Sequence, residues 1–376
     1  MRIVHYHPRA VVGDGGITNS VQRLSTALAA LGADPVIVHD VSAGSRQRPG
    51  ANAEPPGSNA GVQWIGARHL GPSRMLLPVG LERALEGADL LVLNSAWTTH
   101  NARAGAVARK LGVPYALAPR GAYEPALLRR KRVVKRLWWE AVEQPLVRHA
   151  RALHIFFEGE RPSLARLGYH GDVIVAPNGV SVPSGFRWDG GSGGYLLYMG
   201  RFDPEHKGID LLVRAVAELP AGQRPALRLH GPDWRGGKRR VRDLVRTLGV
   251  ESWVTLGDAV YGEQKWATLS RARGFVYPSR WEGFGNSLAE ASALGVPALA
   301  TPYPLARFLG ELGAAIVVEP TSSGVAAGLR ELSNPEAAAV GERAAQVIQD
   351  QFTWEAVARR WLEQARALSV DQEGGS

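Results

Sequence analysis

The chain contains 376 residues, of which 45% are hydrophobic and 21% charged, as is typical of a soluble globular enzyme with more than one domain. It has no cysteine, which excludes disulfides and thiolate metal sites. The formal net charge of +9 favours anionic partners such as nucleotides, nucleic acid or an anionic membrane face. No apolar run is long enough to span a bilayer, and Met1–Tyr6 is typical of a strand and not of a signal peptide, so we expect a cytoplasmic protein.

In the first half of the chain, segments with the hydrophobic pattern of a strand alternate with segments that have the hydrophobic pattern of a helix. Short apolar runs predict buried strands, and apolar residues at helical spacing, such as Val21, Leu24 and Leu28, predict helices. We expect strands at 3–5, 35–39, 62–65, 89–93, 114–118, 152–157 and 173–175, and helices at 18–31, 98–111 and 126–150. This alternation predicts a parallel sheet with helices on both faces.

A glycine-rich hinge separates the two halves. The run Pro177-Asn178-Gly179-Val180 and the segment 189–194 interrupt the alternation, which then restarts. We expect strands at 195–199, 226–230, 253–256, 274–277 and 296–300, and helices at 209–219, 238–248, 263–272, 286–294, 322–332 and 354–368. The predicted class is therefore α/β, with Rossmann-like, doubly wound domains at 1–180 and 181–350 and a C-terminal crossover helix and tail at 351–376.

The stretch from Tyr277 to Glu290 carries the strongest functional signal. A predicted buried strand is followed by a turn containing Gly283 and Gly285 and then by an amphipathic helix. A strand, a glycine turn and a helix start place main-chain N–H groups and the positive end of a helix dipole at one position. That combination favours the binding of anions, phosphate above all.

Two carboxylates flank this helix start. If every residue from Glu282 to Glu290 were helical, the two acids would lie about 12 Å apart at about 1.5 Å per residue. This distance is comparable to the span from ribose to sugar in a nucleotide sugar, so each acid can hold hydroxyls at one end of such a ligand. The alternative is a pair of solvated surface acids, and under both interpretations we expect them outside the hydrophobic core.

Three further motifs carry less specific signals. Gly15-Gly16 follows the first strand and opens the first helix, which indicates either an abbreviated phosphate loop or a plain glycine turn. Arg201 and Lys207 follow the first strand of the second half, where open α/β sheets bind ligands, and both can contact phosphate. Their alternative is a pair of surface cations. Asn178-Gly179 at the hinge is typical of a structural turn.

Together these motifs resemble the glycosyltransferase family 4 group of retaining enzymes. The resemblance runs from Met1 to about Leu368 and implies the GT-B fold, in which two Rossmann-like domains face a central cleft. Its pieces stand here in the order of the family: Gly15-Gly16, Ala176-Pro177-Asn178-Gly179-Val180, Gly200-Arg201 with Lys207-Gly208, and Pro278-Ser279 with Glu282-Gly283-Phe284-Gly285 and Glu290.

The resemblance implies a role for each of these positions. Arg201 and Lys207 would neutralise the diphosphate leaving group, and Glu282 would hold hydroxyls of the transferred sugar, so these three form the expected catalytic set. Glu290 would hold the ribose of the nucleotide. The remaining expected contacts to the sugar donor, several through main-chain N–H groups, are Gly15, Gly16, Phe284, Gly285, Asn286 and Ser287.

One position departs from the family pattern. Many relatives carry a histidine just after the strand that corresponds to 114–118, whereas this chain has Pro119-Arg120-Gly121. Arg120 cannot act as a base, but Arg120 and Asn94 are possible contacts to the sugar or the acceptor. The chain also has no Asp-x-Asp sequence, so we expect a site without metal or other cofactor, in which protein cations replace a divalent ion.

The segment 127–139 is rich in both cations and apolar residues. On a helix, Leu127, Val134, Leu137, Trp138 and Val142 can share one side, flanked by the six cations of 129–136. This pattern predicts a helix lying on an anionic membrane. The alternative is a helix packed into the core with a solvated basic face. No nucleic-acid-binding motif accompanies the charge, so nucleic acid is not expected as a partner.

The expected activity is retaining, metal-independent transfer of a hexose from a UDP- or GDP-linked donor to a cell-envelope glycan or a lipid-linked acceptor. Such an enzyme would be cytoplasmic, with a possible peripheral position on the inner face of the cell membrane. A first alternative keeps the chemistry but uses a soluble small-molecule acceptor, such as an antibiotic. A second alternative is a nucleotide-binding scaffold without catalysis, which the presence of Arg201, Lys207, Glu282 and Glu290 together disfavours.

Overall fold

The computed structural model describes residues 1–9, 16–41, 60–71, 77–125 and 132–370. The chain forms two compact units. The first contains Met1–Gly179 together with the C-terminal helix that begins at Trp354, and the second contains Val180–Thr353. Gly15, Leu127 and the cations Arg129, Arg130 and Lys131 lie outside the described residues.

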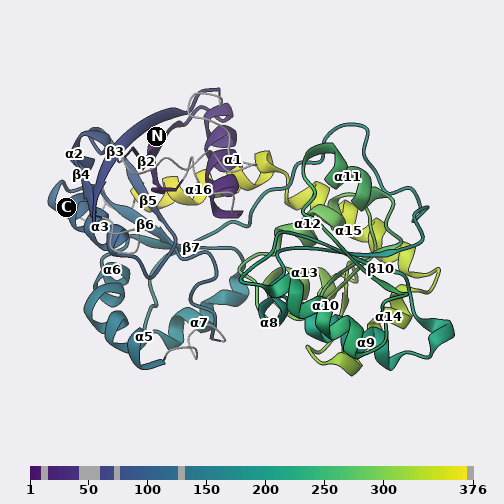
Figure 1. The fold of residues 1–376 in the computed structure, drawn as a ribbon. Coiled ribbons are helices and arrows are strands. Elements are labelled where there is room, and N and C mark those ends of the chain that lie inside the picture. Colours follow the sequence, from purple (N-terminus) through teal and green to yellow (C-terminus); the bar gives the residue numbers. More distant parts are fainter. Residues whose placement is uncertain (10–15, 42–59, 72–76, 126–131, 371–376) are drawn as a thin grey trace. The chain divides into compact units, whose positions relative to one another are not determined.

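The first unit is built on one sheet whose strands are parallel except for the edge pair β3 and β4 (Figure 1). Among the described residues the strand order is β4-β3-β2-β1-β5-β6-β7-β8. The strands are β1 (Arg2–Tyr6), β2 (Asp34–Asp40), β3 (Gln63–Leu70), β4 (Leu77–Val79), β5 (Leu90–Asn94), β6 (Tyr115–Ala118), β7 (Ala152–Ile155) and β8 (Val173–Val175).

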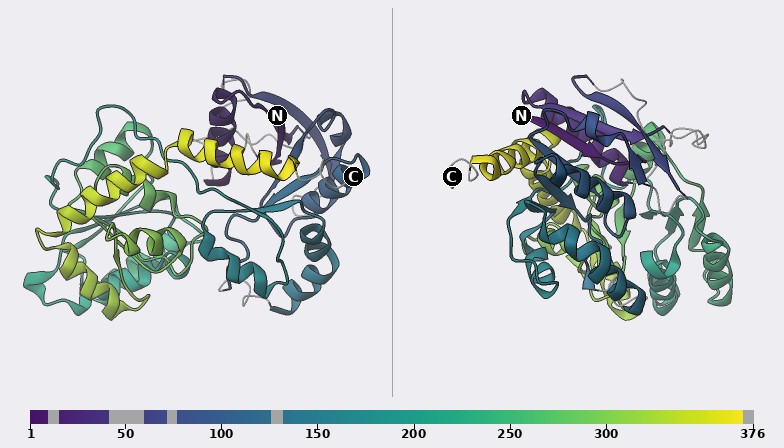
Figure 2. Two further views of the ribbon diagram at one scale, coloured as in Figure 1. Left: turned by 180° about the vertical axis from the view of Figure 1, so that it is seen from behind. Right: turned by 90° about the vertical axis from the view of Figure 1, so that its left-hand side faces the viewer.

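Helices cover both faces of this sheet, as the alternation predicted. The helices are α1 (Gly16–Ala30), α2 (Leu81–Ala84), α3 (Thr99–Lys110), α5 (Arg132–Trp138), α6 (Gln144–Arg148), α7 (Arg161–Arg166) and α16 (Trp354–Val370). Residues of α1 and α16 form a core with one face, and residues of α2, α3, α6 and α7 pack against the other. Figure 2 shows α16, in yellow, running beside α1.

The second unit repeats this plan with a smaller parallel sheet of order β11-β10-β9-β12-β13-β14 among the described residues. Its strands are β9 (Leu196–Met199), β10 (Leu227–His230), β11 (Val254–Gly257), β12 (Gly274–Tyr277), β13 (Ala298–Ala300) and β14 (Ile316–Val317). Its helices are α8 (Pro204–Lys207), α9 (Ile209–Glu218), α10 (Gly237–Thr247), α11 (Gly262–Ser270), α12 (Asn286–Ala293), α13 (Pro304–Glu311), α14 (Ser322–Leu332) and α15 (Ala337–Gln351).

Most predicted elements are present within a few residues of their expected bounds, and the α/β class is confirmed. The structure adds β4, β14, α13 and α15, which the hydrophobic pattern did not predict. The helix expected over 126–150 is interrupted within its described part. There α5 and α6 are separated by a π-helical turn at Trp139–Glu143.

Four histidines of the first unit have a strongly lowered pKa and are neutral at pH 7: His5, His7 and His154 are buried, and His100 is partly buried. Burial lowers the pKa of His5 and of His7 to about 3 and that of His100 to about 4, and it takes the pKa of His154 well below its usual value. The charge of Arg120 adds to the lowering for His5, His7 and His154.

We therefore predict that acid destabilises the first unit. Below pH 6.5 the unfolded histidines bind protons that the native ones reject, so stability falls between pH 6.5 and 4 by up to about 1.4 kcal/mol per pH unit for each histidine. Burial raises the pKa of Glu160 to about 7 and also raises that of Glu143. These two acids oppose the loss of stability in acid, because the native state binds their protons more tightly than the unfolded state does. The four histidines outnumber them. Denaturant titrations read by hydrogen exchange should show a lower midpoint for residues 1–179 at pH 5 than at pH 7.5.

The second unit provides an internal reference for this experiment. Among its described histidines, only His206 has a pKa that is clearly lowered. Its acid sensitivity above pH 5 should be smaller than that of the first unit. Equal midpoints of the first unit at pH 5 and pH 7.5 would show that the buried histidines do not control its stability.

Candidate functional site

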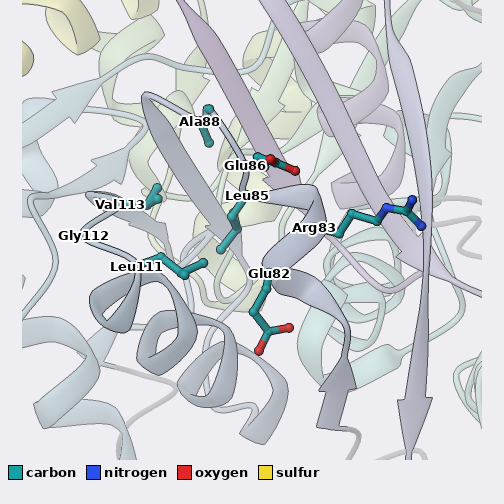
Figure 3. Close-up of a pocket in the computed structure, with 9 residues that line it drawn as sticks. Glu82, Arg83, Leu85, Glu86, Ala88, Leu111, Gly112 and Val113 are labelled. Carbon is teal, nitrogen blue, oxygen red and sulfur yellow. The ribbon is translucent and has the colours of Figure 1, made fainter.

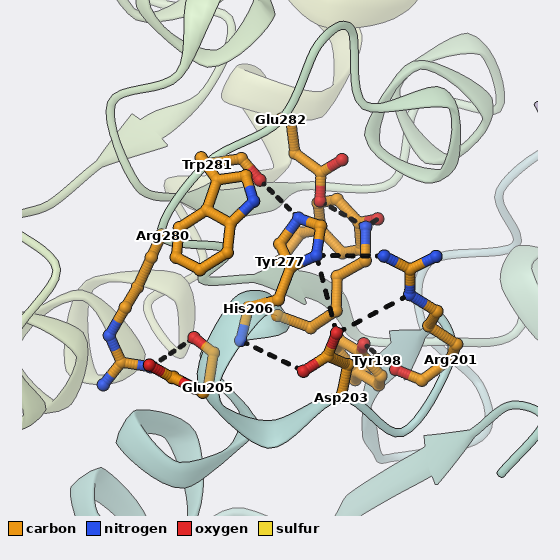
Figure 4. Close-up of polar contacts among 10 residues, drawn as sticks. Tyr198, Arg201, Asp203, Glu205, His206, Tyr277, Arg280, Trp281 and Glu282 are labelled. Atoms are coloured by element: carbon orange, nitrogen blue, oxygen red, sulfur yellow. Dashed lines mark hydrogen bonds and ion pairs between the residues drawn. The ribbon is translucent and has the colours of Figure 1, made fainter. Parts of the chain in front are cut away.

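Two loops meet at the topological switch point of the second unit. The strand order reverses between the neighbours β9 and β12, of which β9 leads to Arg201 and Lys207 and β12 leads to Glu282. Because the carboxyl ends of parallel strands lie at one edge of a sheet, the two loops lie side by side (Figure 4). Open α/β sheets bind their ligands at such a position.

A buried ion pair joins these loops. The Lys207 ammonium lies 2.5 Å from Oε1 of Glu282 and donates a hydrogen bond of 2.9 Å to the Tyr277 hydroxyl. Only 10% of the Lys207 side chain and 11% of the Glu282 side chain are exposed. The loops approach closely at Gly208, where a Cβ would lie 1.9 Å from the carbonyl oxygen of Pro278. Glu282 is therefore not a solvated surface acid, although it does not belong to a hydrophobic core.

The ion pair sets the charge of Glu282. Burial by itself raises the pKa of this carboxyl, but the charge of Lys207 and its hydrogen bond outweigh burial, and the pKa is lowered. Glu282 is therefore ionised at neutral pH and acts only as a hydrogen-bond acceptor. The pair as a whole carries no net charge.

Arg201 lies beside this pair and remains accessible. Its Nη2 donates to Nδ1 of His206 at 3.0 Å, its Nε lies 3.9 Å from Oδ2 of Asp203, and its Cζ lies 4.8 Å from the centre of the Trp234 ring. The Arg201 side chain is 39% exposed, in contrast to the nearly buried Lys207. A partly exposed guanidinium with several N–H donors can bind phosphate oxygens in a bidentate manner.

Arg280 anchors the loop that carries Glu282. Its two terminal nitrogens each donate to the Asp210 carboxylate at 2.7 Å, and Nη1 also donates to the carbonyl oxygen of Glu205 at 2.7 Å. This bidentate pair connects the loop after β12 to α8 and α9. The sequence motif did not single out Arg280, because its partner Asp210 is distant in the chain.

The loop after β12 leads directly into α12. Gly285 occupies the N-cap with a left-handed φ of 99° and has no side chain that could cap the first turn, to which Asn286 and Ser287 belong. The Phe284 ring is buried and lies 6.2 Å from the ring of Phe352, so only its main chain is suited to contact a ligand. A helix start of this kind attracts anions through its N–H groups and its dipole.

Glu290 forms a second and separate ion pair. Its Oε1 lies 2.8 Å from Nζ of Lys265, and the two side chains are 23% and 24% exposed. The same ammonium lies 4.4 Å from the centre of the Trp266 ring. Glu290 is thus neither an isolated solvated acid nor a partner of Glu282. No motif marked Lys265, which comes from α11.

Asn94 and Arg120 come together in the first unit. Nη2 of Arg120 donates to Oδ1 of Asn94 at 2.8 Å, and its Cζ lies 5.7 Å from the centre of the Phe156 ring. Burial lowers the pKa of Arg120 to about 10, which keeps it cationic at neutral pH. Asn94 ends β5 and Arg120 follows β6, and the carboxyl ends of these two strands lie at one edge of the sheet. Gly16, the remaining predicted site residue of this unit, begins α1.

Backbone strain gathers at the same edge. Four non-glycine residues of the described chain have positive φ, and three of them, Ser95, Trp97 and Arg120, follow β5 and β6. The buried Glu143 holds this region by accepting hydrogen bonds from the Trp97 N–H at 3.0 Å and from the Tyr123 hydroxyl at 2.7 Å. Strained backbone of this kind is typical of functional sites. No sequence motif marked Glu143, which lies in the π-helical turn.

A shallow pocket lies at the opposite edge of the first sheet (Figure 3). It is lined by residues of α2 and of the turns that precede β5 and β6, including Glu82, Glu86 and Leu111. Because these turns lead into the amino ends of the strands, the pocket does not include any of the predicted site residues. Among the described residues, no group of three or more histidine, aspartate or glutamate side chains is placed to hold a metal ion.

Two family profiles match the chain. The glycosyl transferase 4-like domain matches residues 15–179, and the glycosyl transferases group 1 family matches residues 191–349. These two ranges correspond to the two units of the structure. The chain therefore belongs to the group 1 glycosyltransferases, in agreement with the resemblance of its motifs.

Two curated relatives are mannosyltransferases by name. The chain is 30% identical over 178 residues to the O-antigen chain mannosyltransferase B of Escherichia coli, a match to 47% of this chain and 42% of that protein. It is 27% identical over 196 residues to the GDP-mannose:cellobiosyl-diphosphopolyprenol alpha-mannosyltransferase of Xanthomonas oryzae pv. oryzae (strain PXO99A), a match to 49% of each. The chain thus matches about half the length of these curated relatives.

Solved structures confirm the fold. Sucrose-phosphate synthase from Thermosynechococcus elongatus is similar with a TM-score of 0.72 and 20% sequence identity, over 99% of this chain and 100% of that one. The chain has the GT-B fold that the motifs predicted.

The Lys207–Glu282 pair predicts a stability difference between the two acids. Glu282→Gln leaves the Lys207 charge nearly buried without a counter-charge, and a lost hydrogen bond to a charged group costs about 1.5–3 kcal/mol. Glu290→Gln breaks a pair that is more exposed than Lys207–Glu282, with side chains 23% and 24% exposed, and ion pairs that solvent can reach contribute about 0–1 kcal/mol. Thermal unfolding should therefore show a lower Tm for Glu282→Gln, by roughly 2–4 °C per kcal/mol, and a Tm near wild type for Glu290→Gln.

The double variant Lys207→Met/Glu282→Gln provides the control for this prediction. Because it removes both charges, it should lose less stability than the sum of the two single variants. Additive losses, or a Glu282→Gln variant that melts like wild type, would show that the two side chains do not stabilise each other.

Proposed function

We propose that this chain transfers a mannosyl group, with retention of configuration and without a metal ion, from GDP-mannose to a lipid-linked glycan. The observation that carries the proposal is the grouping of Arg201, the Lys207–Glu282 pair and the α12 N-terminus at one switch point. The names of the curated mannosyltransferase relatives support the choice of donor and acceptor.

The charges suit a diphosphate leaving group. Arg201 is the exposed cation, and the Lys207 ammonium has three donors, of which two are directed to Glu282 and Tyr277. The third can be directed to a phosphate oxygen, while the start of α12 adds main-chain N–H groups and a positive dipole. These fixed groups stabilise the negative charge that develops on the diphosphate as the bond between sugar and phosphate breaks.

The two acids hold the ends of the sugar donor. Glu282 is ionised and fixed by its ion pair with Lys207, so its carboxylate can accept hydrogen bonds from hydroxyls of the transferred sugar. Glu290 accepts from the ribose hydroxyls next to Lys265.

The reaction then proceeds on one face of the sugar. The acceptor hydroxyl attacks the anomeric carbon from the side of the leaving diphosphate, whose released oxygen takes the hydroxyl proton. A new glycosidic bond forms as the bond to phosphate breaks, and the configuration is retained. Arg120 keeps its proton at neutral pH, so it cannot act as a base.

A donor panel tests this proposal. The protein should hydrolyse GDP-mannose, and transfer its sugar to a polyprenyl-diphosphate-linked glycan, faster than it uses the UDP-linked hexoses. Both rates should survive excess EDTA, and Arg201→Ala should reduce them. Loss of activity in EDTA with recovery in Mn²⁺ or Mg²⁺ would refute metal independence. Preference for a soluble aglycone would favour the small-molecule acceptor, and turnover of no nucleotide sugar would favour a scaffold.

Helix α5 supports a membrane-bound acceptor. Val134 and Leu137 are 65% and 63% exposed, so this part of the predicted apolar side is not packed into the core, and the neighbouring Val133 is 72% exposed. The cations Lys135 and Arg136 lie on the same short helix, and 129–132 adds four more in the sequence. We propose that this segment docks on anionic lipid, where apolar side chains insert and cations face the headgroups. None of the described helices is both long and apolar enough to span a bilayer.

Vesicle binding separates the two contributions of this helix. Replacing Arg129, Arg130, Arg132 and Arg136 by Ser should abolish binding to phosphatidylglycerol vesicles, because each cation contributes about 1 kcal/mol near an anionic surface. Val133→Ser/Val134→Ser/Leu137→Ser should weaken binding at both low and high salt.

A matched control comes from the second unit. Leu312→Ser, which replaces another exposed leucine, should bind the vesicles like wild type. Equal binding of wild type to neutral phosphatidylcholine vesicles, or no binding to either kind, would refute docking through this helix.

A further inference from the structure

His206 lies between the two ligand-binding loops of the second unit. It belongs to α8, and its ring stacks on the Trp281 ring with 4.4 Å between centroids and 12° between planes (Figure 4). Its Nε2 lies 3.0 Å from the carbonyl oxygen of Trp281, and its Nδ1 lies 3.0 Å from Nη2 of Arg201. The histidine thus connects the arginine after β9 to the loop after β12.

These partners define the tautomer of the ring. The Arg201 guanidinium has only N–H donors, so Nδ1 must accept its hydrogen bond. The Trp281 carbonyl can only accept, so Nε2 must carry the hydrogen. The ring is therefore neutral, which agrees with a pKa lowered to about 4 by burial and by the charges of Lys207 and Arg201, against the opposing charge of Glu282. At neutral pH His206 serves as a fixed hydrogen-bond acceptor.

The ring itself has little freedom to move. Stacking on Trp281 fixes its plane, and the hydrogen bond to the Trp281 carbonyl fixes its rotation within that plane. The main chain is held as well, because the Arg280 N–H donates to the His206 carbonyl oxygen at 2.9 Å. A rigid acceptor of this kind holds a flexible arginine in one direction without neutralising its charge.

The neutral state of the His206 ring is important because the carboxylate of Asp203 lies close to both His206 and Arg201. Its Oδ2 lies 3.9 Å from Nε of Arg201 and 3.6 Å from Nδ1 of His206. Without the histidine contact, Arg201 can turn toward this carboxylate and form a closer ion pair. An arginine paired in that way has fewer donors and less net charge to offer to a phosphate.

We propose that His206 is a positioning residue, which directs the Arg201 guanidinium toward the diphosphate of the sugar donor and keeps its ion pair with Asp203 from becoming closer. This inference rests on the proposed function of Arg201. It adds a role for a residue that neither the motifs nor the comparisons assign.

Two conservative variants separate this role from simple structural support. In His206→Asn the amide oxygen lies near the position of Nδ1 and can still accept from Arg201. In His206→Gln the amide lies near the position of Nε2 and can preserve only the contact to Trp281. We expect calorimetric titration to show a GDP affinity about 10- to 100-fold lower for His206→Gln, as for the loss of a hydrogen bond to a charged group, and near wild type for His206→Asn.

The ligand series locates the effect at the phosphates. GMP lacks the phosphate that leaves with the sugar bond, so its affinity should change much less than that of GDP in His206→Gln. In an Arg201→Ala background, His206→Gln should have no further effect on GDP binding. In ¹⁵N spectra of wild type, Nε2 should be protonated and Nδ1 unprotonated from pH 5.5 to 8.

Several outcomes would overturn the inference. If Asn weakens GDP binding as much as Gln does, or if Gln retains its effect without Arg201, His206 supports the loop and does not position the arginine. If wild type binds GDP, Arg201→Ala weakens it, and both His206 variants bind like wild type, this inference fails while the proposed function stands. If wild type binds neither GDP nor UDP, or Arg201→Ala has no effect, the proposed function itself fails and this inference with it.

Discussion

The ion pair between Lys207 and Glu282 is the interaction on which the site of the second unit depends. Removing two charges from water is costly, and only close geometry with additional hydrogen bonds offsets that cost. Here the close approach at Gly208 and the Tyr277 hydroxyl supply both. The pair joins loops from two neighbouring strands and keeps Glu282 ionised. Because it is neutral as a whole, attraction of an anion falls to Arg201 and the start of α12.

Around this pair, the other contacts hold the two loops in place before any ligand binds. Arg280 binds Asp210 in a bidentate manner, and His206 stacks on Trp281 and accepts from Arg201. Charged groups held in fixed directions need little reorganisation when charge develops on a leaving group, which is the main source of electrostatic catalysis. The partly exposed Arg201 is the flexible member of the set, so its neighbours have the largest influence on how it meets a phosphate.

The sequence predicted the parts of the molecule that follow local rules. Alternating apolar periods located most strands and helices, and the order of the motifs identified the family and its fold. The hydrophobic pattern did not predict helix α15, because its buried face contains mainly small residues, Ala337, Gly341 and Ala344, which give a weak hydrophobic signal. The sequence also did not predict the ion pairs of Glu282 with Lys207 and of Glu290 with Lys265, because the order of the strands brings these residues together. The assigned roles of these residues in binding and catalysis stay predictions.

The distribution of charge explains why one helix start, and not another, suits phosphate. The segments 129–136 and 238–246 carry net charges of +6 and +4, and the chain as a whole carries +9, so the rest of the chain is nearly neutral. The second segment lies in α10, yet its helix start is occupied: Asp233 accepts from the N–H groups of Gly236 at 2.9 Å and Lys238 at 2.7 Å. In α12 the cap is Gly285, which has no carboxylate to compete with a ligand. Positive charge alone therefore does not make a helix start accessible to an anion; the start of α12 differs from that of α10 in having no carboxylate at its cap.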